Sequence, residues 1–218
     1  MSTSDILDPI KHSPILPKLL EDLQWFWHDE QLRRREFYEW LTPNIKAEYV
    51  EGEVIMHSPV SIEHNRVTGN LFTAIKVFCN YYMSNAYVGV EKMLTRFTRN
   101  DYEPDICYFG AEKAAQFKPS QNIFPVPDFI IEIISKSTEK NDRGIKYTDY
   151  EIHKVKEYWI VDPIAQKIEQ YILINDIYEL QPIVNDTITS VVIPNFSIPL
   201  QAVFDEAANA TWIKGLNK

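Results

Sequence analysis

The ten residues from Val126 to Ser135 constrain the fold more than any other part of the chain. Most of them are apolar and several are β-branched, which is typical of a strand that is covered on both faces. Glu132 lies inside this run. An unpaired ionised carboxylate there would cost several kcal/mol. We therefore expect a cation from the chain, a bound metal ion or an edge open to water to compensate Glu132.

Strand and helix patterns are interleaved along the rest of the chain, with one long helix before the central strands and one after. This arrangement predicts an α/β (α+β) fold, a mixed β-sheet flanked by helices. The expected elements are a β-hairpin over 47–56 with its turn at Glu51 and Gly52, a helix over 62–82, strands over 86–90, 92–98, 104–109 and 126–135, a helix over 137–154, a strand over 157–163, a hairpin over 167–180, a strand over 191–193 and a helix over 200–208.

The first 43 residues differ from the rest. Pro9, Pro14 and Pro17 predict an extended or poorly ordered arm over 1–20, and helix-forming residues predict a helix over 21–41. The run Arg33-Arg34-Arg35 is expected on a solvated helix face. The helix holds more aromatic side chains than a short helix can bury on its own domain, which makes homodimerisation a hypothesis. We divide the chain into an N-terminal segment, 1–43, and a domain over 44–210.

Charge and composition narrow the class of function. The net charge of −9 argues against a general nucleic-acid coat protein. It does not exclude a nucleic-acid enzyme, because metal-binding carboxylates make an active site acidic. No apolar run is long enough to span a membrane, and the N-terminus lacks the apolar core of a signal peptide. The two cysteines, Cys79 and Cys107, fit a reducing compartment, so we expect a cytoplasmic protein with no membrane contact.

Several common catalytic sites are missing from the sequence. It contains no glycine-rich phosphate loop, no G-x-S-x-G motif and no zinc-binding spacing of Cys and His. A set of carboxylates remains: Asp105 follows Pro104 at the start of one strand, and Glu132 lies inside the next buried strand. Two acidic side chains on neighbouring strands can share a hard divalent cation such as Mg²⁺. A lysine beside them can orient water or support a phosphate.

These residues and their order resemble the PD-(D/E)XK nuclease motif and, more narrowly, the Uma-two family of restriction-endonuclease-like proteins. The matching strings are EYVEGE at 48–53, FIIEIISKST at 129–138 and, after Lys146, EYWIVDP at 157–163. His64 lies where the family has a histidine at the start of a helix. The resemblance covers residues 45–205. It implies an endonuclease-like fold with an added hairpin, Mg²⁺ (or Mn²⁺) held by Asp105 and Glu132, and DNA as substrate.

The chain departs from the superfamily motif at one important position. The motif places a lysine two residues after the acid, but here that residue is Ile134. Residues 132 and 134 share one face of a strand, so the missing amine would have been beside the metal. The family supplies an amine from the next helix, which nominates Lys146, with Lys136 as a second candidate. Asp128 is too far along the strand to share an ion with Glu132, at about 13 Å.

Each candidate also has a structural interpretation. Glu132 could form an ion pair with Lys146 or an arginine, and Asp105 could be a turn residue. Lys146 could pair with Asp142, while Glu48 could be a solvated hairpin acid rather than an auxiliary ligand. His64 could be a capping residue, and Tyr150 and Tyr158 are expected in the core. The catalytic candidates are therefore Asp105, Glu132, Lys146, Glu48 and His64 in a metal-dependent DNA endonuclease. The alternative is a nuclease-fold module that binds DNA or protein without catalysis.

Overall fold

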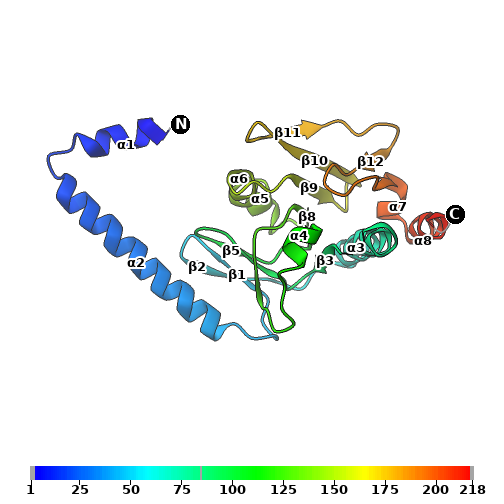
Figure 1. The fold of residues 1–218 in the computed structure, drawn as a ribbon, viewed down its shortest axis with the longest axis horizontal. Helices are drawn as coiled ribbons and strands as arrows, with labels where there is room; N and C mark the ends of the chain where they lie inside the picture. The colour runs from blue at the N-terminus through cyan, green and yellow to red at the C-terminus, as the bar shows by residue number, and fades with distance from the viewer. Residues whose placement is uncertain (1–2, 84, 217–218) are drawn as a thin grey trace.

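The computed structural model describes residues 3–83 and 85–216. Its centre is a six-stranded sheet with the strand order β11-β10-β9-β8-β6-β3 (Figure 1). Strands β8 and β9 are parallel, whereas every other pair of neighbours in this sheet is antiparallel, so the predicted mixed sheet is confirmed. The strands are β3 (Tyr87–Val90), β6 (Ile106–Phe109), β8 (Phe129–Ile133), β9 (Glu157–Asp162), β10 (Lys167–Ile174) and β11 (Ile177–Gln181).

A second sheet of five strands contains the predicted hairpin. Its order is β2-β1-β5-β4-β7, and β1 (Ala47–Val50) pairs with β2 (Glu53–Met56) as expected. The turn needs a glycine, because Gly52 has a φ of +89° that L residues rarely adopt. The remaining strands of this sheet are β4 (Leu94–Arg96), β5 (Asp101–Tyr102) and β7 (Ile123–Phe124).

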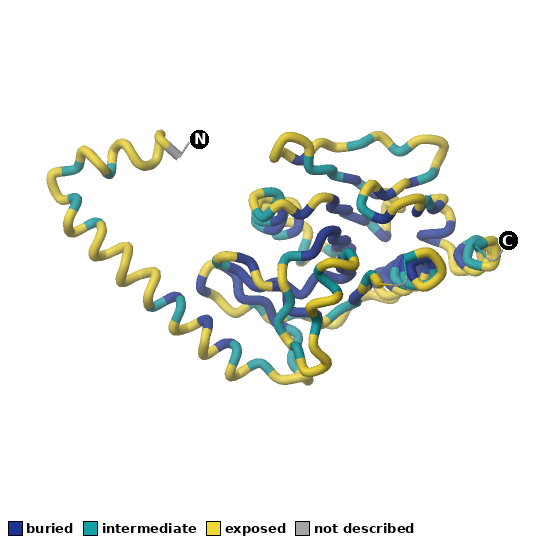
Figure 2. The backbone as a smooth tube through the Cα atoms, viewed as in Figure 1, coloured by how far each residue is buried: buried dark blue, intermediate teal, exposed yellow. Residues whose placement is uncertain are grey.

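The central strand β8 is buried on both faces, as its composition predicts. Phe129, Ile131 and Ile133 pack into the core cluster under α3 (Ile62–Tyr82), and this side of the sheet also meets α7 (Leu200–Phe204). Ile130 and Ile134 point the other way, into a cluster with Tyr150 and Tyr158. Because side chains alternate along a strand, Glu132 faces this second cluster. Figure 2 shows the buried residues concentrated in the two sheets.

The helix expected over 137–154 is two helices, α5 (Glu139–Asp142) and α6 (Ile145–Ile152). The break lies at Gly144, where an added Cβ would come within 2.7 Å of the Lys140 carbonyl oxygen. The chain can turn this closely only at a glycine, and the turn resets the direction of α6. The sequence of this segment also suggests that Ile145 and Ile152 face inward. Ile145 is half-buried, but Ile152 is 61% exposed, so the inward position is wrong for Ile152.

Smaller differences lie in the connections and at the C-terminal end. The polar connection over 110–125 contains α4 (Ala111–Ala114) and β7. The strand expected over 191–193 is wrong, because this segment is the connection between β12 (Thr187–Thr189) and β13 (Ser197–Pro199), which form a two-stranded sheet. The closing helix is divided at Asp205 into α7 and α8 (Glu206–Gly215). No helix among the described residues has the length and apolar composition needed to cross a bilayer.

The expectation of an extended arm over 1–20 is wrong for the described residues, because the segment is helical. Helix α1 (Thr3–Lys11) precedes the 25-residue helix α2 (Leu16–Trp40). Pro14 lies between the two helices, and Pro17 lies in the first turn of α2. A backbone N–H in the first turn has no partner within the helix, so proline loses no hydrogen bond there. Two of the three prolines therefore lie at or near helix starts. Residues 1 and 2 lie outside the described part of the chain.

Arg34 joins α2 to the domain, which corrects the expectation that all three arginines are solvated. Its guanidinium group is buried and donates to both carboxylate oxygens of Asp101, at 2.6 and 2.7 Å. It also donates to the backbone carbonyls of Phe97, Thr98 and Asn100. Such bidentate geometry suits arginine, because its planar group offers a fixed fork of donors.

We predict that Arg34→Ala lowers the free energy of unfolding by about 3–5 kcal/mol, because it leaves the buried Asp101 carboxylate without its cation. The matched control is Arg35→Ala, which truncates the neighbouring exposed arginine and should change stability by no more than about 0.5 kcal/mol. Urea unfolding of both variants, followed by circular dichroism, measures the difference. Equal stabilities would contradict the anchoring role of Arg34.

Candidate active site

Glu132 is compensated by groups on helix α6. Its Oε1 atom accepts hydrogen bonds from the Lys146 ammonium group at 3.0 Å and from the Tyr150 hydroxyl at 2.8 Å. Residues 146 and 150 are four apart on one helix, so both side chains leave the same face and reach the same oxygen. Lys146 is therefore the cation of the chain that compensates the buried Glu132 carboxylate.

One ammonium group is shared by three carboxylates. Lys146 Nζ lies 2.9 Å from Glu48 Oε1 on β1 and 3.4 Å from Asp142 Oδ1 on α5, in addition to its contact with Glu132. Burial lowers the pKa of Lys146, but the three carboxylates raise it well above its usual value. Lys146 is therefore a permanently charged group in the centre of the site.

The three acids respond differently to this shared charge. Burial raises the pKa of Glu132 to about 8, because Lys146 only partly offsets the desolvation and the repulsion from Asp142, Asp105 and Glu48. Burial also raises the pKa of Asp142. Burial alone would raise the pKa of Glu48 too, but Lys146 and His57 lower it to about 2. One positive charge offsets three buried negative charges only in part, so Glu132 and Asp142 keep a proton to a higher pH than ordinary carboxyl groups do.

Backbone-to-side-chain hydrogen bonds connect Asp105, which directly precedes β6, with Glu132 and Ile133 on β8. The backbone N–H of Asp105 donates to Glu132 Oε2 at 3.3 Å, and the N–H of Ile133 donates to Asp105 Oδ2 at 2.8 Å. The other carboxylate oxygen of Asp105 lies 3.3 Å from His64 Nε2 and 3.7 Å from Lys46 Nζ. Burial raises the pKa of Asp105, but His64, Lys46 and the Ile133 amide together hold it below its ordinary value.

These groups surround one cavity of about 320 Å³. Asp105, Glu132 and Lys146 line it together with His64, and the exposed Lys136 lies at its edge. Two buried polar atoms around it, His64 Nδ1 and Glu103 Oε2, make neither a hydrogen bond nor an ion pair within the described residues. Buried polar atoms are usually paired, so these two atoms mark the cavity as a place for a polar ligand or ion.

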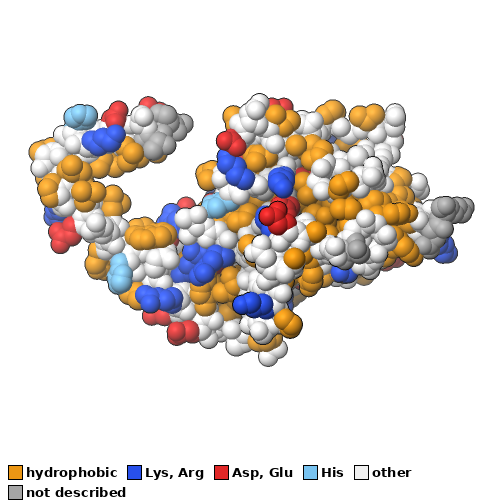
Figure 3. Space-filling model, in the orientation of Figure 1, with side chains coloured by type: hydrophobic (Ala, Val, Ile, Leu, Met, Phe, Trp, Pro, Cys, Tyr) orange, Lys and Arg blue, Asp and Glu red, His pale blue; other side chains and the backbone are white. Residues whose placement is uncertain are grey.

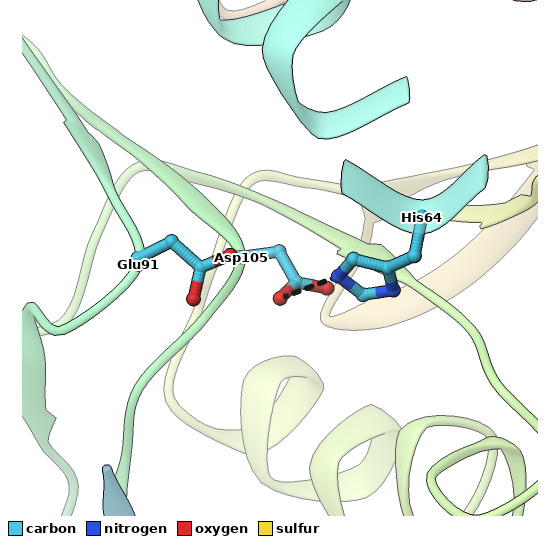
Figure 4. Close-up of side chains that lie close together, drawn as sticks. All are labelled: His64, Glu91 and Asp105. Carbon is cyan, nitrogen blue, oxygen red and sulfur yellow. Dashed lines mark ion pairs between the residues drawn. The ribbon is translucent and has the colours of Figure 1, made fainter. Parts of the chain in front are cut away.

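A second set of possible ligands shares Asp105. His64, Glu91 and Asp105 each offer one ligand atom, and these atoms lie within 4.8 Å of one another. Figure 4 shows the His64 ring and the Asp105 carboxylate directed toward each other, with the Glu91 carboxylate on the other side of Asp105. Lys46 forms ion pairs with both acids. Asp105 is therefore the common member of an all-oxygen pair with Glu132 and a mixed set with His64 and Glu91.

The structure brings the five predicted site residues, Asp105, Glu132, Lys146, Glu48 and His64, into one connected cluster. Ile134 is buried on the same face of the chain as Glu132, so an aliphatic group fills the position of the motif lysine. Asp128 instead lies near Lys113 and Lys156, away from this cluster.

The site also contains residues that are not among the predicted site residues. Tyr150 is in the core as expected, yet its hydroxyl group contacts Glu132. Spacing on α6 gave a signal for this contact, since residue 150 follows Lys146 by one turn. Residues that reach the site only through tertiary folding gave none: Lys46, His57, Glu91 and Glu103.

Comparisons with known proteins identify a family and a similar fold. A family model described as "Putative restriction endonuclease" (Uma2) matches residues 34–201. An uncharacterized protein of Synechocystis sp. is 26% identical over 132 residues, which is 60% of this chain and 74% of that protein. The fold is similar to the crystal structure of a "putative nuclease belonging to DUF820" from Anabaena variabilis. The TM-score is 0.67 at 18% identity, covering 82% of this chain and 97% of that one.

Glu103 gives a pH-dependent prediction. Burial raises the pKa of its carboxyl group to about 7, opposed by Lys46 and His57. The folded protein therefore binds a proton here at pH values where the unfolded chain has lost it, so this group destabilises the fold as pH rises from about 4.5 to 7. We expect the free energy of unfolding of Glu103→Gln, relative to that of the wild type, to rise by on the order of 3 kcal/mol across this pH interval.

Urea unfolding at several pH values with EDTA present measures this gain. The control is Glu53→Gln, which changes an exposed carboxyl group on the same hairpin as Glu48. A stability difference between Glu103→Gln and the wild type that stays constant with pH would contradict the assignment.

Proposed function

This chain belongs to the Uma2 family, whose model is described as "Putative restriction endonuclease", and we propose that it is a divalent-metal-dependent endonuclease that hydrolyses phosphodiester bonds in DNA. The observation that carries the proposal is the convergence of Asp105, Glu132 and Lys146 on one cavity. Acids and a lysine in this arrangement suit a reaction in which a phosphate must be bound and its developing charge stabilised.

The donor groups fit a divalent cation. In the described part of the chain, four carboxylates line the cavity (Glu103, Asp105, Glu132 and Asp142) and two more pair with its lysines (Glu48 and Glu91), against three ammonium groups (Lys46, Lys136 and Lys146). A divalent cation would offset this excess of negative charge and would displace the protons held by Glu132 and Glu103. Asp105 and Glu132 form the oxygen pair that suits Mg²⁺. His64 and Glu91 would add a nitrogen and an oxygen, a set that suits Mn²⁺ better.

When bound, such a cation supplies two effects, lowering the pKa of a water molecule and neutralising charge on the phosphate. The chain's own residues supply the rest. Lys146 offers a fixed positive charge to a phosphate oxygen, and Glu48 and Asp142 hold its ammonium group in position. Tyr150 fixes the rotamer of Glu132 through its hydroxyl group. Lys136 at the cavity edge extends the positive charge toward a nucleic-acid backbone.

The second candidate function is a module on the same scaffold that binds DNA or protein without catalysis. Ile134 favours it, because this position carries the lysine in the nuclease motif. The close pairing of Lys146 with three acids also favours it, since an ion pair of this kind can be purely structural. The two functions differ in a measurable way, because only the first requires turnover.

We predict that the protein cuts plasmid DNA with Mg²⁺ or Mn²⁺, and that Glu132→Gln and Lys146→Met each reduce the rate by about 10²–10³-fold. The matched control is Asp128→Asn, which removes the charge of a buried acid just before the same strand but outside the site. Agarose-gel assays of all four proteins measure the rates. DNA binding without any cutting would support the module instead, and cutting that is unchanged in Glu132→Gln would contradict the proposed active site.

Calorimetric titration with Mn²⁺ distinguishes the two donor sets. We expect saturable binding that Asp105→Asn abolishes, because both sets contain Asp105. Glu132→Gln should weaken binding strongly if the oxygen pair holds the ion, whereas His64→Ala should do so if the mixed set holds it. Removing one metal ligand or its support typically costs 10–100-fold in affinity. Unchanged binding by Asp105→Asn would contradict the proposed cation site.

A further inference from the structure

One face of helix α2 packs against the domain along only part of the helix. Toward its C-terminal end, Glu30, Arg34 and Phe37 are the buried residues of the helix. They are spaced four and three apart, so they lie on one face. Arg34 binds Asp101, Glu30 pairs with Arg99, and Phe37 packs on Tyr49. This face is the one that attaches α2 to the domain.

The same face continues toward the N-terminal end of α2 as an apolar stripe, in which Phe26 still contacts Arg99 of the domain at 5.7 Å from its ring centroid. The stripe is made of residues at three-to-four spacing that lead into Glu30: Leu16, Leu19, Leu20, Leu23, Phe26 and Trp27. Leu20 is 48% exposed, Leu23 54%, Phe26 45% and Trp27 44%. Figure 1 shows this part of α2 projecting from the domain, and Figure 3 shows open space between it and the body. A helix that projects in this way gains little stability from its own fold.

We propose that this stripe pairs with the same stripe of a second copy of the chain, so that the protein dimerises through α2. The amount of apolar surface agrees with this partner. With full side-chain areas on the order of 200 Å², the four exposed fractions amount to roughly 400 Å². A standard interface buries about 800 Å² per partner, of which roughly 450 Å² is apolar. A symmetric contact uses one surface twice, so it requires no complementary patch elsewhere.

The charges beside the stripe disfavour other partners. Over residues 16–29, α2 carries one basic residue, Lys18, and three acidic ones, Glu21, Asp22 and Asp29. A helix that lies on a membrane surface is rich in Lys and Arg on its polar face. A helix that follows a phosphate backbone is basic as well. An apolar stripe between acidic flanks fits a protein helix, and a copy of itself meets that description.

The proposal is independent of the nuclease function. The stripe ends before residue 34, where the match to the family model begins, and none of its residues contacts the cavity. Dimerisation can therefore be present when no DNA is cut, and cutting can occur when the protein is a monomer.

Two tryptophans on opposite faces of α2 provide a matched test. Trp27 belongs to the stripe, whereas Trp25 lies on the opposite face by helix geometry and is 68% exposed. Light scattering after size exclusion should give a mass of two chains for the wild type. Trp27→Glu should give one chain and Trp25→Glu two. Far-UV circular dichroism checks that both variants keep their helices.

A monomeric wild type over a wide range of protein concentration would overturn the proposal. So would a dimer that survives Trp27→Glu, or one that both substitutions disrupt equally. Cross-linking provides a second measurement that does not depend on a charge in the stripe. With a bis-maleimide reagent, Leu23→Cys should link two chains and Trp25→Cys should not, since native Cys79 and Cys107 are buried. Equal linking of both variants would also contradict the proposal.

Discussion

A buried ammonium group that three acids share is the interaction on which the site depends. Lys146 connects Glu48 of the five-stranded sheet with Glu132 of the six-stranded sheet and Asp142 of α5. Removing this one side chain would leave three buried carboxylates without the ammonium group that they share, which is far costlier than the loss of a surface ion pair. The ammonium group thus connects the two sheets. Because three carboxylates share one positive charge, the cavity keeps an excess of negative charge.

The backbone contributes as much to the site as the side chains do. Amide groups of Asp105 and Ile133 each bond the acid of the other strand, so the distance between the two carboxylates is set by the pairing of β6 with β8. Metal-binding groups that are carried by paired strands need little reorganisation when an ion arrives. The break at Gly144 has a similar effect, because it turns α6 so that Lys146 and Tyr150 both face Glu132.

The sequence revealed the parts of this structure that depend on local chemistry. The cost of burying Glu132 predicted a cation of the chain, a metal ion or an edge open to water, and the structure has the first of these in Lys146. Hydrophobic periodicity predicted β8, α3 and the first hairpin. Contacts between distant segments gave no such signal. Lys46 and Glu91 reach Asp105 only through tertiary folding. The predictions from the prolines of residues 1–20 and from the run of three arginines were wrong for physical reasons. Proline is also favoured in the first turn of a helix, as at Pro17. An arginine in a charged run can be buried when it pairs with an aspartate, as Arg34 does with Asp101.

The position of Asp101 in the chain has a consequence for synthesis. Arg34 bonds a residue 67 positions later, so α2 leaves the ribosome well before its anchor exists. Until residues 97–101 have been made, the nascent chain lacks Asp101, the carboxylate that pairs with the Arg34 guanidinium group when it is buried. The first long helix can therefore dock through Arg34 only after residue 101 has been made, and docking closes a loop of 67 residues.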